Sequence, residues 1–107
     1  MLVEQRTYTT VAGKINDYLA LYEAEGMAIQ KRILQRMVGY YRTEIGPLNQ
    51  VVHMWAYQDL NERAERRGQL AADKGWQAYA EKMRPLLITM ESKILVPAPF
   101  FKPQWNS

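Results

Sequence analysis

The stretch of sequence that decides the fold is Val51-Val52-His53-Met54-Trp55-Ala56-Tyr57. Its β-branched and aromatic residues predict a strand over 51–57, the strongest strand pattern in the chain. Successive side chains of a strand point to opposite faces, so one face carries Val52, Met54 and Ala56 and the other carries Val51, His53, Trp55 and Tyr57. Both faces suit burial, but helices on one side of a sheet cover only one of them. The second face therefore needs a partner sheet or the Pro-rich tail as its cover.

The segments around this strand predict the order β-α-β-β-α-β. We expect strands at 2–10, 37–43, 51–57 and 86–94, and helices at 14–25, 27–35, 60–72 and 74–83. Gly26 is expected to be a C′ residue or a kink between the first two helices. Asp59 and Asp73 are candidate N-caps, with Glu62 completing a capping box, and Pro85 ends the last helix. This order is typical of the α+β class with a ferredoxin-like βαββαβ fold and an antiparallel four-stranded sheet.

The 107 residues provide room for one domain, which we expect to cover 1–107 with an extended Pro-rich tail at 97–107. A hydrophobic content of 48% argues against disorder. A globule of this size leaves much of its apolar surface in water. Together with the two apolar faces of the central strand, this predicts a homodimer with two-fold symmetry.

Composition excludes several classes of protein. The chain has no cysteine, so it has neither disulfides nor thiolate metal sites. Its net charge of +3 is spread among acidic residues, and the run 62–67 is interpreted as a solvated helix face, so we expect no nucleic-acid partner. No apolar run approaches the ~20 residues of a membrane span, and no signal peptide opens the chain. We therefore expect a cytoplasmic protein. GxGxxG, P-loop, GxSxG and HExxH motifs are absent.

His53 is the only histidine and the candidate catalytic residue. It is the one side chain expected to titrate near neutrality, so it could act as an acid, a base or an anion-binding donor. The alternative is a hydrogen-bonded buried imidazole or an interface residue. A metal site would need further ligands at suitable spacing, and the sequence shows none. We therefore predict no metal.

Arg6 and Tyr8 share one face of the first strand with Glu4. If that face is covered, the charges must form an ion pair or line a polar pocket, in which Arg6 could hold a carboxylate or a phosphate. Trp55 belongs to an aromatic group that could line a ligand pocket or pack in the core or a dimer interface. The candidate ligand-binding residues are Arg6, Tyr8, His53 and Trp55.

Several segments together resemble the NIPSNAP family. The main one is Gly39–Tyr57, supported by Glu4–Tyr8, by the spacing of Arg63, Arg66 and Arg67, by 76–79 and by 91–97, so the resemblance covers nearly the whole chain. Tyr41 stands where Trp is expected to be common. The resemblance implies a ferredoxin-like subunit that pairs into a dimeric α/β barrel. Related barrels include monooxygenases and haem proteins, but a shared fold does not transfer a function.

Our leading hypothesis is a homodimeric domain that binds a small apolar or aromatic ligand or another protein, without a cofactor. Arg6 and His53 would be the polar anchors of a cleft between the sheet and the helices. The runner-up is a cofactor-independent oxygenase or isomerase that uses His53 as a base. A third hypothesis is a purely structural dimer without a ligand. The sequence leaves open whether the protein is an enzyme.

Overall fold

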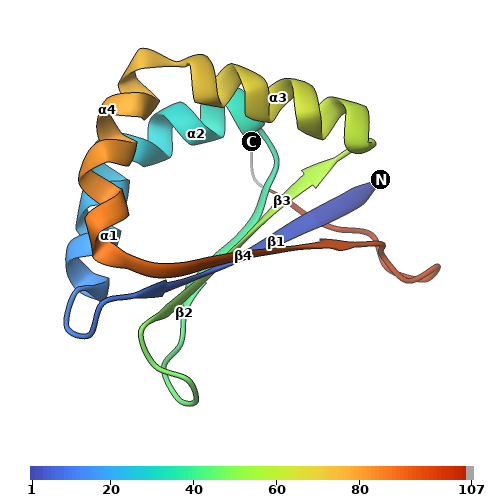
Figure 1. Ribbon diagram of the computed structural model, residues 1–107. Helices are drawn as coiled ribbons and strands as arrows, with labels where there is room; N and C mark the ends of the chain where they lie inside the picture. Colours follow the sequence, from blue (N-terminus) through green and yellow to red (C-terminus); the bar gives the residue numbers. More distant parts are fainter. Residues whose placement is uncertain (106–107) are drawn as a thin grey trace.

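A computed structural model describes residues 1–105 and has one antiparallel four-stranded sheet with helices on one face (Figure 1). The strands are β1 (Leu2–Thr10), β2 (Met37–Arg42), β3 (Gln50–Tyr57) and β4 (Leu87–Leu95), in the order β2-β3-β1-β4. The α-helices are α1 (Ile15–Leu21), α2 (Met27–Leu34), α3 (Leu60–Ala72) and α4 (Lys74–Met83). The π-helix η1 (Tyr22–Gly26) joins α1 to α2, and the 3-10 turn η2 (Arg84–Leu86) follows α4. This architecture confirms the predicted ferredoxin-like α+β fold.

Of the two alternatives predicted for Gly26, the C′ residue is wrong, while the interruption between α1 and α2 is a π turn that ends at this glycine. Gly26 has φ −107° and ψ −38°, so the chain stays helical there and continues through the π turn into α2. Its role is close packing, because a Cβ at this position would lie 2.9 Å from Cζ of Tyr79 on α4. Single π turns of this kind are rare and occur mostly inside α-helices.

The predicted helix starts at Asp59 and Asp73 are confirmed. Oδ1 of Asp59 accepts the amide of Glu62 at 2.8 Å, and Oδ1 of Asp73 accepts the amide of Trp76 at 2.8 Å. The return bond of the capping box differs from the expectation, since Oε1 of Glu62 accepts the amide of Gln58 instead. The same carboxylate pairs with Arg36 at 2.6 Å, which ties the start of α3 to the segment before β2.

The core lies between the helices and the inner face of the sheet. On β3, the four side chains predicted to share one face (Val51, His53, Trp55 and Tyr57) point inward and are all buried. One apolar group gathers under α1, η1 and α4, and contains Tyr8, Tyr18, Tyr22, Val51, Tyr79 and Met83. A second lies under α2 and α3, and contains Ile33, Leu34, Trp55, Tyr57 and Leu70.

The chain's own tail covers part of the outer face of the sheet. Val96, Pro97, Phe101 and Pro103 face Val3, Val38 and Met54 of the sheet across a cavity of about 470 Å³. The tail contains a turn in which Phe101 N donates to Ala98 O at 2.9 Å, and Arg36 lies 5.8 Å from the ring centroid of Trp105. Residues 106 and 107 of the predicted tail lie outside the described residues.

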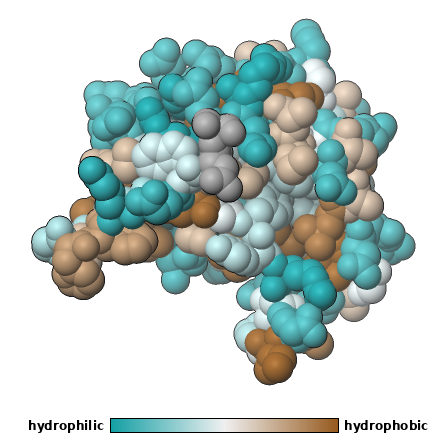
Figure 2. Space-filling model, turned by 180° about the vertical axis from the view of Figure 1, so that it is seen from behind, coloured by the Kyte–Doolittle hydropathy of each residue, from teal (hydrophilic) through white to brown (hydrophobic). Residues whose placement is uncertain are grey.

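Apolar side chains are exposed at two projections of the molecule. One is the β2–β3 loop, where Ile45 is 93% exposed, and the other is the turn of the tail, where Phe100 is 93% exposed. In Figure 2 the helical side of the molecule is mainly hydrophilic, while these two projections are hydrophobic. No helix among residues 1–105 has the length and apolarity that crossing a membrane requires.

Candidate functional site

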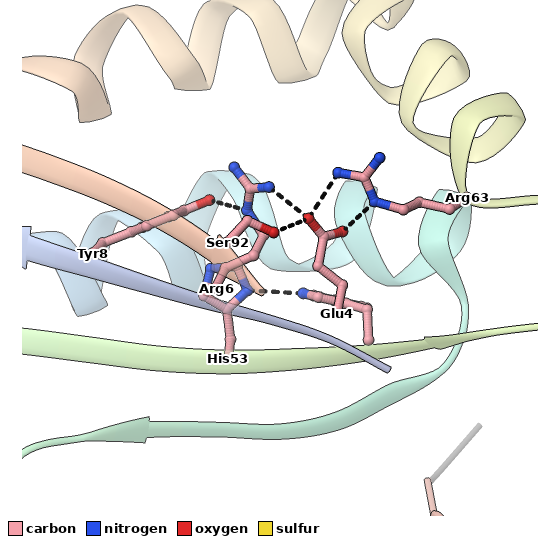
Figure 3. A network of polar contacts seen from close by, with 7 residues as sticks. Glu4, Arg6, Tyr8, His53, Arg63 and Ser92 are labelled. Carbon is pink, nitrogen blue, oxygen red and sulfur yellow. Dashed lines mark hydrogen bonds and ion pairs between the residues drawn. The ribbon is translucent and has the colours of Figure 1, made fainter. Parts of the chain in front are cut away.

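Three strands direct polar side chains toward the helices. Arg6 of β1 lies opposite His53 of β3 and opposite Ser92 of β4. Directly opposed residues of antiparallel strands share a face of the sheet, and the two-residue period of β1 adds Glu4 and Tyr8 to it. These residues and Arg63 of α3 form what we call the inner polar cluster: Glu4, Arg6, Tyr8, His53, Arg63 and Ser92 (Figure 3).

Glu4 is the centre of the cluster and is fully buried. Arg63 binds both of its oxygens, with Nε 3.1 Å from Oε1 and Nη2 2.9 Å from Oε2. Oε2 also accepts Nη1 of Arg6 at 2.9 Å and Oγ of Ser92 at 2.6 Å. Burial alone would raise the pKa of Glu4, but the bonds from Arg63 and Ser92 and the charge of Arg6 hold its pKa at about 2. The carboxylate is therefore ionised at neutral pH.

Arg6 links Glu4 to the aromatic part of the site. Its Nε donates to the hydroxyl of Tyr8 at 2.9 Å, and its guanidinium carbon lies 5.5 Å from the centroid of the Tyr8 ring. Burial disfavours the charge of Arg6, yet contacts with Tyr8 and Glu4 raise its pKa overall. Arg6 thus carries a permanent charge in a position that is only 9% exposed.

His53 is enclosed by aromatic rings and is 1% exposed. Tyr40 stacks on the imidazole with a centroid distance of 4.7 Å, and Tyr8 meets it edge-on, also at 4.7 Å. Nδ1 of His53 accepts the indole N–H of Trp55 at 2.7 Å. Burial, followed by the charges of Arg6 and Arg67, lowers the pKa of His53 to about 3. The imidazole is therefore neutral, and its proton resides on Nε2 because Nδ1 is an acceptor.

Two buried polar atoms in this region have no hydrogen-bond partner among residues 1–105. They are Nε2 of His53 and the hydroxyl of Tyr57. A buried donor that lacks a partner is costly, so such atoms are rare in folded proteins and call for an explanation, such as a functional role or a bound water or ion. The feature that carries the site is therefore an unused N–H beside a charged arginine.

A cavity of about 440 Å³ lies next to the tyrosines of the site, between α1, η1 and β2. Its lining includes Tyr22 and Tyr40. Tyr40 stacks on Tyr22 at 4.5 Å on one side and on His53 on the other, and its hydroxyl bonds to that of Tyr18 at 2.7 Å. Within residues 1–105, Arg6 and His53 line neither this cavity nor the one under the tail. The Tyr40 ring stands between His53 and the open space.

The structure brings all four predicted ligand-binding residues together. Arg6 contacts Tyr8, Tyr8 contacts His53, and His53 contacts Trp55. Ser92 was not among the predicted site residues. The β1–β4 register, which places Ser92 opposite Arg6, would have found it.

Two further residues of the site come from α3. Arg63 and Arg67 are four residues apart and so share one helix face, but the run 62–67 was interpreted only as a solvated face. Neither its charge pattern nor its spacing shows which turn lies above the sheet. Among the described residues, no three side chains of the His, Cys, Asp or Glu types are grouped as a metal ion would need.

Comparison with known proteins identifies relatives along most of the chain. The family model described as NIPSNAP matches residues 3–102. A NIPSNAP family protein of Agrobacterium tumefaciens is 48% identical, with a TM-score of 0.91, over 92% of this chain and 94% of its own. A second protein of that organism, a NIPSNAP family protein described as having unknown function, is 45% identical with a TM-score of 0.94, over 97% of this chain and 94% of its own.

More distant similarities complete this comparison. The protein NipSnap homolog of Dictyostelium discoideum is 34% identical over 88% of this chain but only 41% of its own length. The chain thus spans less than half of the curated relatives it matches. A putative antibiotic biosynthesis monooxygenase from Nitrosomonas europaea shares the fold with a TM-score of 0.67 at 10% identity, over 91% of this chain and 98% of its own. At that identity the similarity concerns the fold alone.

Proposed function

The chain belongs to the NIPSNAP family, and from this premise and the geometry of its inner sheet face we propose that it is a homodimeric small-ligand-binding domain. The ligand site lies between the sheet and the helices, with Arg6 and His53 as polar anchors and Tyr8 and Trp55 as aromatic walls. The observation that carries the proposal is the buried Nε2–H of His53, which has no acceptor among residues 1–105.

The same geometry favours a donor role for His53 over the role of a base. A general base needs a free lone pair and a pKa near the working pH. The Nδ1 lone pair of His53 already accepts the Trp55 N–H, and its pKa is about 3. The Nε2–H can instead donate to a carbonyl or carboxylate oxygen of a ligand. The oxygenase or isomerase hypothesis therefore has no specific observation in its favour.

The outer face of the sheet supports the homodimer. Tyr41 is 60% exposed, Val96 80% and Phe101 60%, and all three line the cavity under the tail. Burial of such apolar surface contributes about 25 cal/mol per Å², so a few side chains of this size supply several kcal/mol to association. The apolar loop and tail projections extend this surface. A second copy of the chain would cover what the tail leaves in water.

Two measurements test the proposal. Light scattering at micromolar concentration should give twice the 12.5 kDa of one chain. A thermal-shift screen of small aromatic compounds should find at least one that stabilises the wild type, and His53→Gln should remove that effect while the variant keeps its folded circular-dichroism spectrum. A 12.5 kDa species would exclude the dimer, and an equal response of His53→Gln would exclude the site.

A further inference from the structure

The inner polar cluster holds more positive than negative charge. Arg6, Arg63 and Arg67 lie on or beside it, whereas Glu4 is its only carboxylate. Of the two acids of α3, Glu62 is already engaged by Arg36 and Arg66, and Glu65 is exposed. Positive charge that is removed from water without a counter-charge is unfavourable. Arg67 is half-buried and has no carboxylate partner among residues 1–105, so its charge is available to an anion from outside the chain.

The position of Arg67 follows from that of Arg63. In Figure 1, α3 and β1 run in the same direction, and Arg63 of α3 binds Glu4 of β1. One helical turn separates Arg63 from Arg67, so Arg67 lies on the same face of α3 and further along in the direction in which Arg6 follows Glu4 on β1. In agreement, the charges of Arg6 and Arg67 both lower the pKa of His53, after burial itself. In the described part of the chain, no carboxylate pairs with Arg67.

The unused hydrogen-bonding groups lie in the same place. Nε2–H of His53 and the hydroxyl of Tyr57 are buried and unpartnered among residues 1–105, and the charge of Arg67 acts on both residues. Arg6 uses Nε and Nη1 for Tyr8 and Glu4, which leaves its Nη2 for another acceptor. Every one of these groups can donate a hydrogen bond. An oxyanion accepts several such bonds at once.

The site is open on the side of β4. Met90 lies opposite Tyr8 and Ile94 opposite Glu4, so both belong to the inner face of the sheet. Nevertheless Met90 is 47% exposed and Ile94 43% exposed, because the helices do not extend over this edge strand. Ser92, between them, is exposed as well. An apolar surface thus borders the positive cluster where a ligand can enter.

We propose that the inner face of β1 and β4, beside α3, binds an organic monocarboxylate with an apolar body. The carboxylate would accept hydrogen bonds from Arg67, from Nη2 of Arg6 and from Nε2 of His53, and the body would lie along Met90 and Ile94. This inference rests on the proposed function and adds the charge and the shape of the ligand. An inorganic anion would satisfy the charge but would leave the apolar surface unused.

The test uses 3-phenylpropionate, its neutral amide and inorganic phosphate at equal ionic strength, with the full chain. Titration calorimetry should show that the carboxylate binds about tenfold more tightly than the amide, as expected for one charge-assisted hydrogen bond, and that phosphate binds more weakly than the carboxylate. Arg67→Met should abolish the preference for the carboxylate. Arg42→Met, which removes the same charge at the opposite edge of the sheet, should leave it intact.

The outcomes separate the two proposals. Equal binding of the carboxylate and the amide would overturn the anion inference while the proposed ligand site stands. If phosphate bound as tightly as the carboxylate, the proposal that the ligand has an apolar body would be wrong. If none of the three compounds bound while the thermal-shift screen still found a ligand that depends on His53, the monocarboxylate inference would fail and the proposed site would stand. Independently of any ligand, Arg67→Met should raise the melting temperature, because it removes a positive charge that has no partner. Arg63→Met should lower the melting temperature, because the Glu4 carboxylate loses two hydrogen bonds. A lower melting temperature in both variants would contradict the surplus of positive charge.

Discussion

Trp55 donates its indole N–H to Nδ1 of His53 across 2.7 Å, and this bond determines which imidazole nitrogen carries the proton. Both side chains belong to β3, two residues apart on the inner face, and both are buried. The bond therefore presents Nε2–H of His53 toward the rest of the polar cluster. A histidine oriented in this way by its neighbour acts as a donor with a fixed direction.

Replacement of Trp55 by Phe tests this relationship. Nδ1 loses its only donor, so the imidazole should become a mixture of the two neutral tautomers instead of the Nε2–H form alone. The lost hydrogen bond and the smaller ring should destabilise the fold by about 2 kcal/mol. Long-range ¹H–¹⁵N spectra report the tautomer and urea unfolding reports the stability. A wild-type spectrum with the proton on Nδ1 would refute the assignment.

The buried neutral state of His53 predicts an acid-dependent stability. Its pKa is about 3 in the fold and 6.5 ordinarily, so below pH 6.5 the unfolded chain takes up a proton that the native state does not. The contribution of neutral His53 to the free energy of unfolding is fully present above pH 6.5 and is lost as the pH decreases toward 3. At pH 5 the loss should be about 2 kcal/mol relative to pH 7.5. Urea unfolding of His53→Gln should lack this component, and an identical pH dependence would show that His53 is accessible to protons.

Glu4→Gln should destabilise the protein by about 3 kcal/mol at pH 7, because Arg6 and Arg63 lose their buried counter-charge. The depressed pKa of Glu4 contributes stability that is present above pH 4.5 and is lost as the pH falls toward 2. The difference between wild type and variant should therefore shrink over that range in urea unfolding. Glu44→Gln is the matched control, since that carboxylate is 77% exposed and its loss should cost less than about 0.5 kcal/mol. If the two substitutions had equal effects, Glu4 would not be the buried counter-charge that holds Arg6 and Arg63.

Features encoded within a few residues could be predicted from the sequence. The alternation of β3, the limits of β1 and the caps at Asp59 and Asp73 depend on neighbouring residues only, and all agree with the structure. The π turn at Gly26 could not be predicted, because it accommodates Tyr79, which lies 53 positions further along the chain.

The candidate site was predictable in part for the same reason. The alternation of β1 placed Glu4, Arg6 and Tyr8 on one face, and the single histidine drew attention to β3. The partners of Glu4 come from α3 and β4, which are 59 and 88 residues away in the sequence. A pairing at such distances depends on the strand order and on the direction of α3, and a single sequence contains no local signal for either. For this reason Arg67 was predicted to lie on a solvated helix face.

Two glycine substitutions in helical segments should have opposite effects. An alanine at Gly26 would place Cβ 2.9 Å from Cζ of Tyr79, whose ring is buried and cannot swing into solvent. Overpacking of this kind costs about 1–3 kcal/mol, so Gly26→Ala should lower the free energy of unfolding by that amount.

Gly68 lies within α3, and no atom is found within 4 Å of the corresponding Cβ among the described residues. Gly68→Ala should therefore stabilise the protein by about 0.5–1 kcal/mol through the higher helix propensity of alanine. Urea unfolding of the two variants under the same conditions measures both effects. If Gly26→Ala were neutral or stabilising, the π turn would not be needed to make room for the Tyr79 ring.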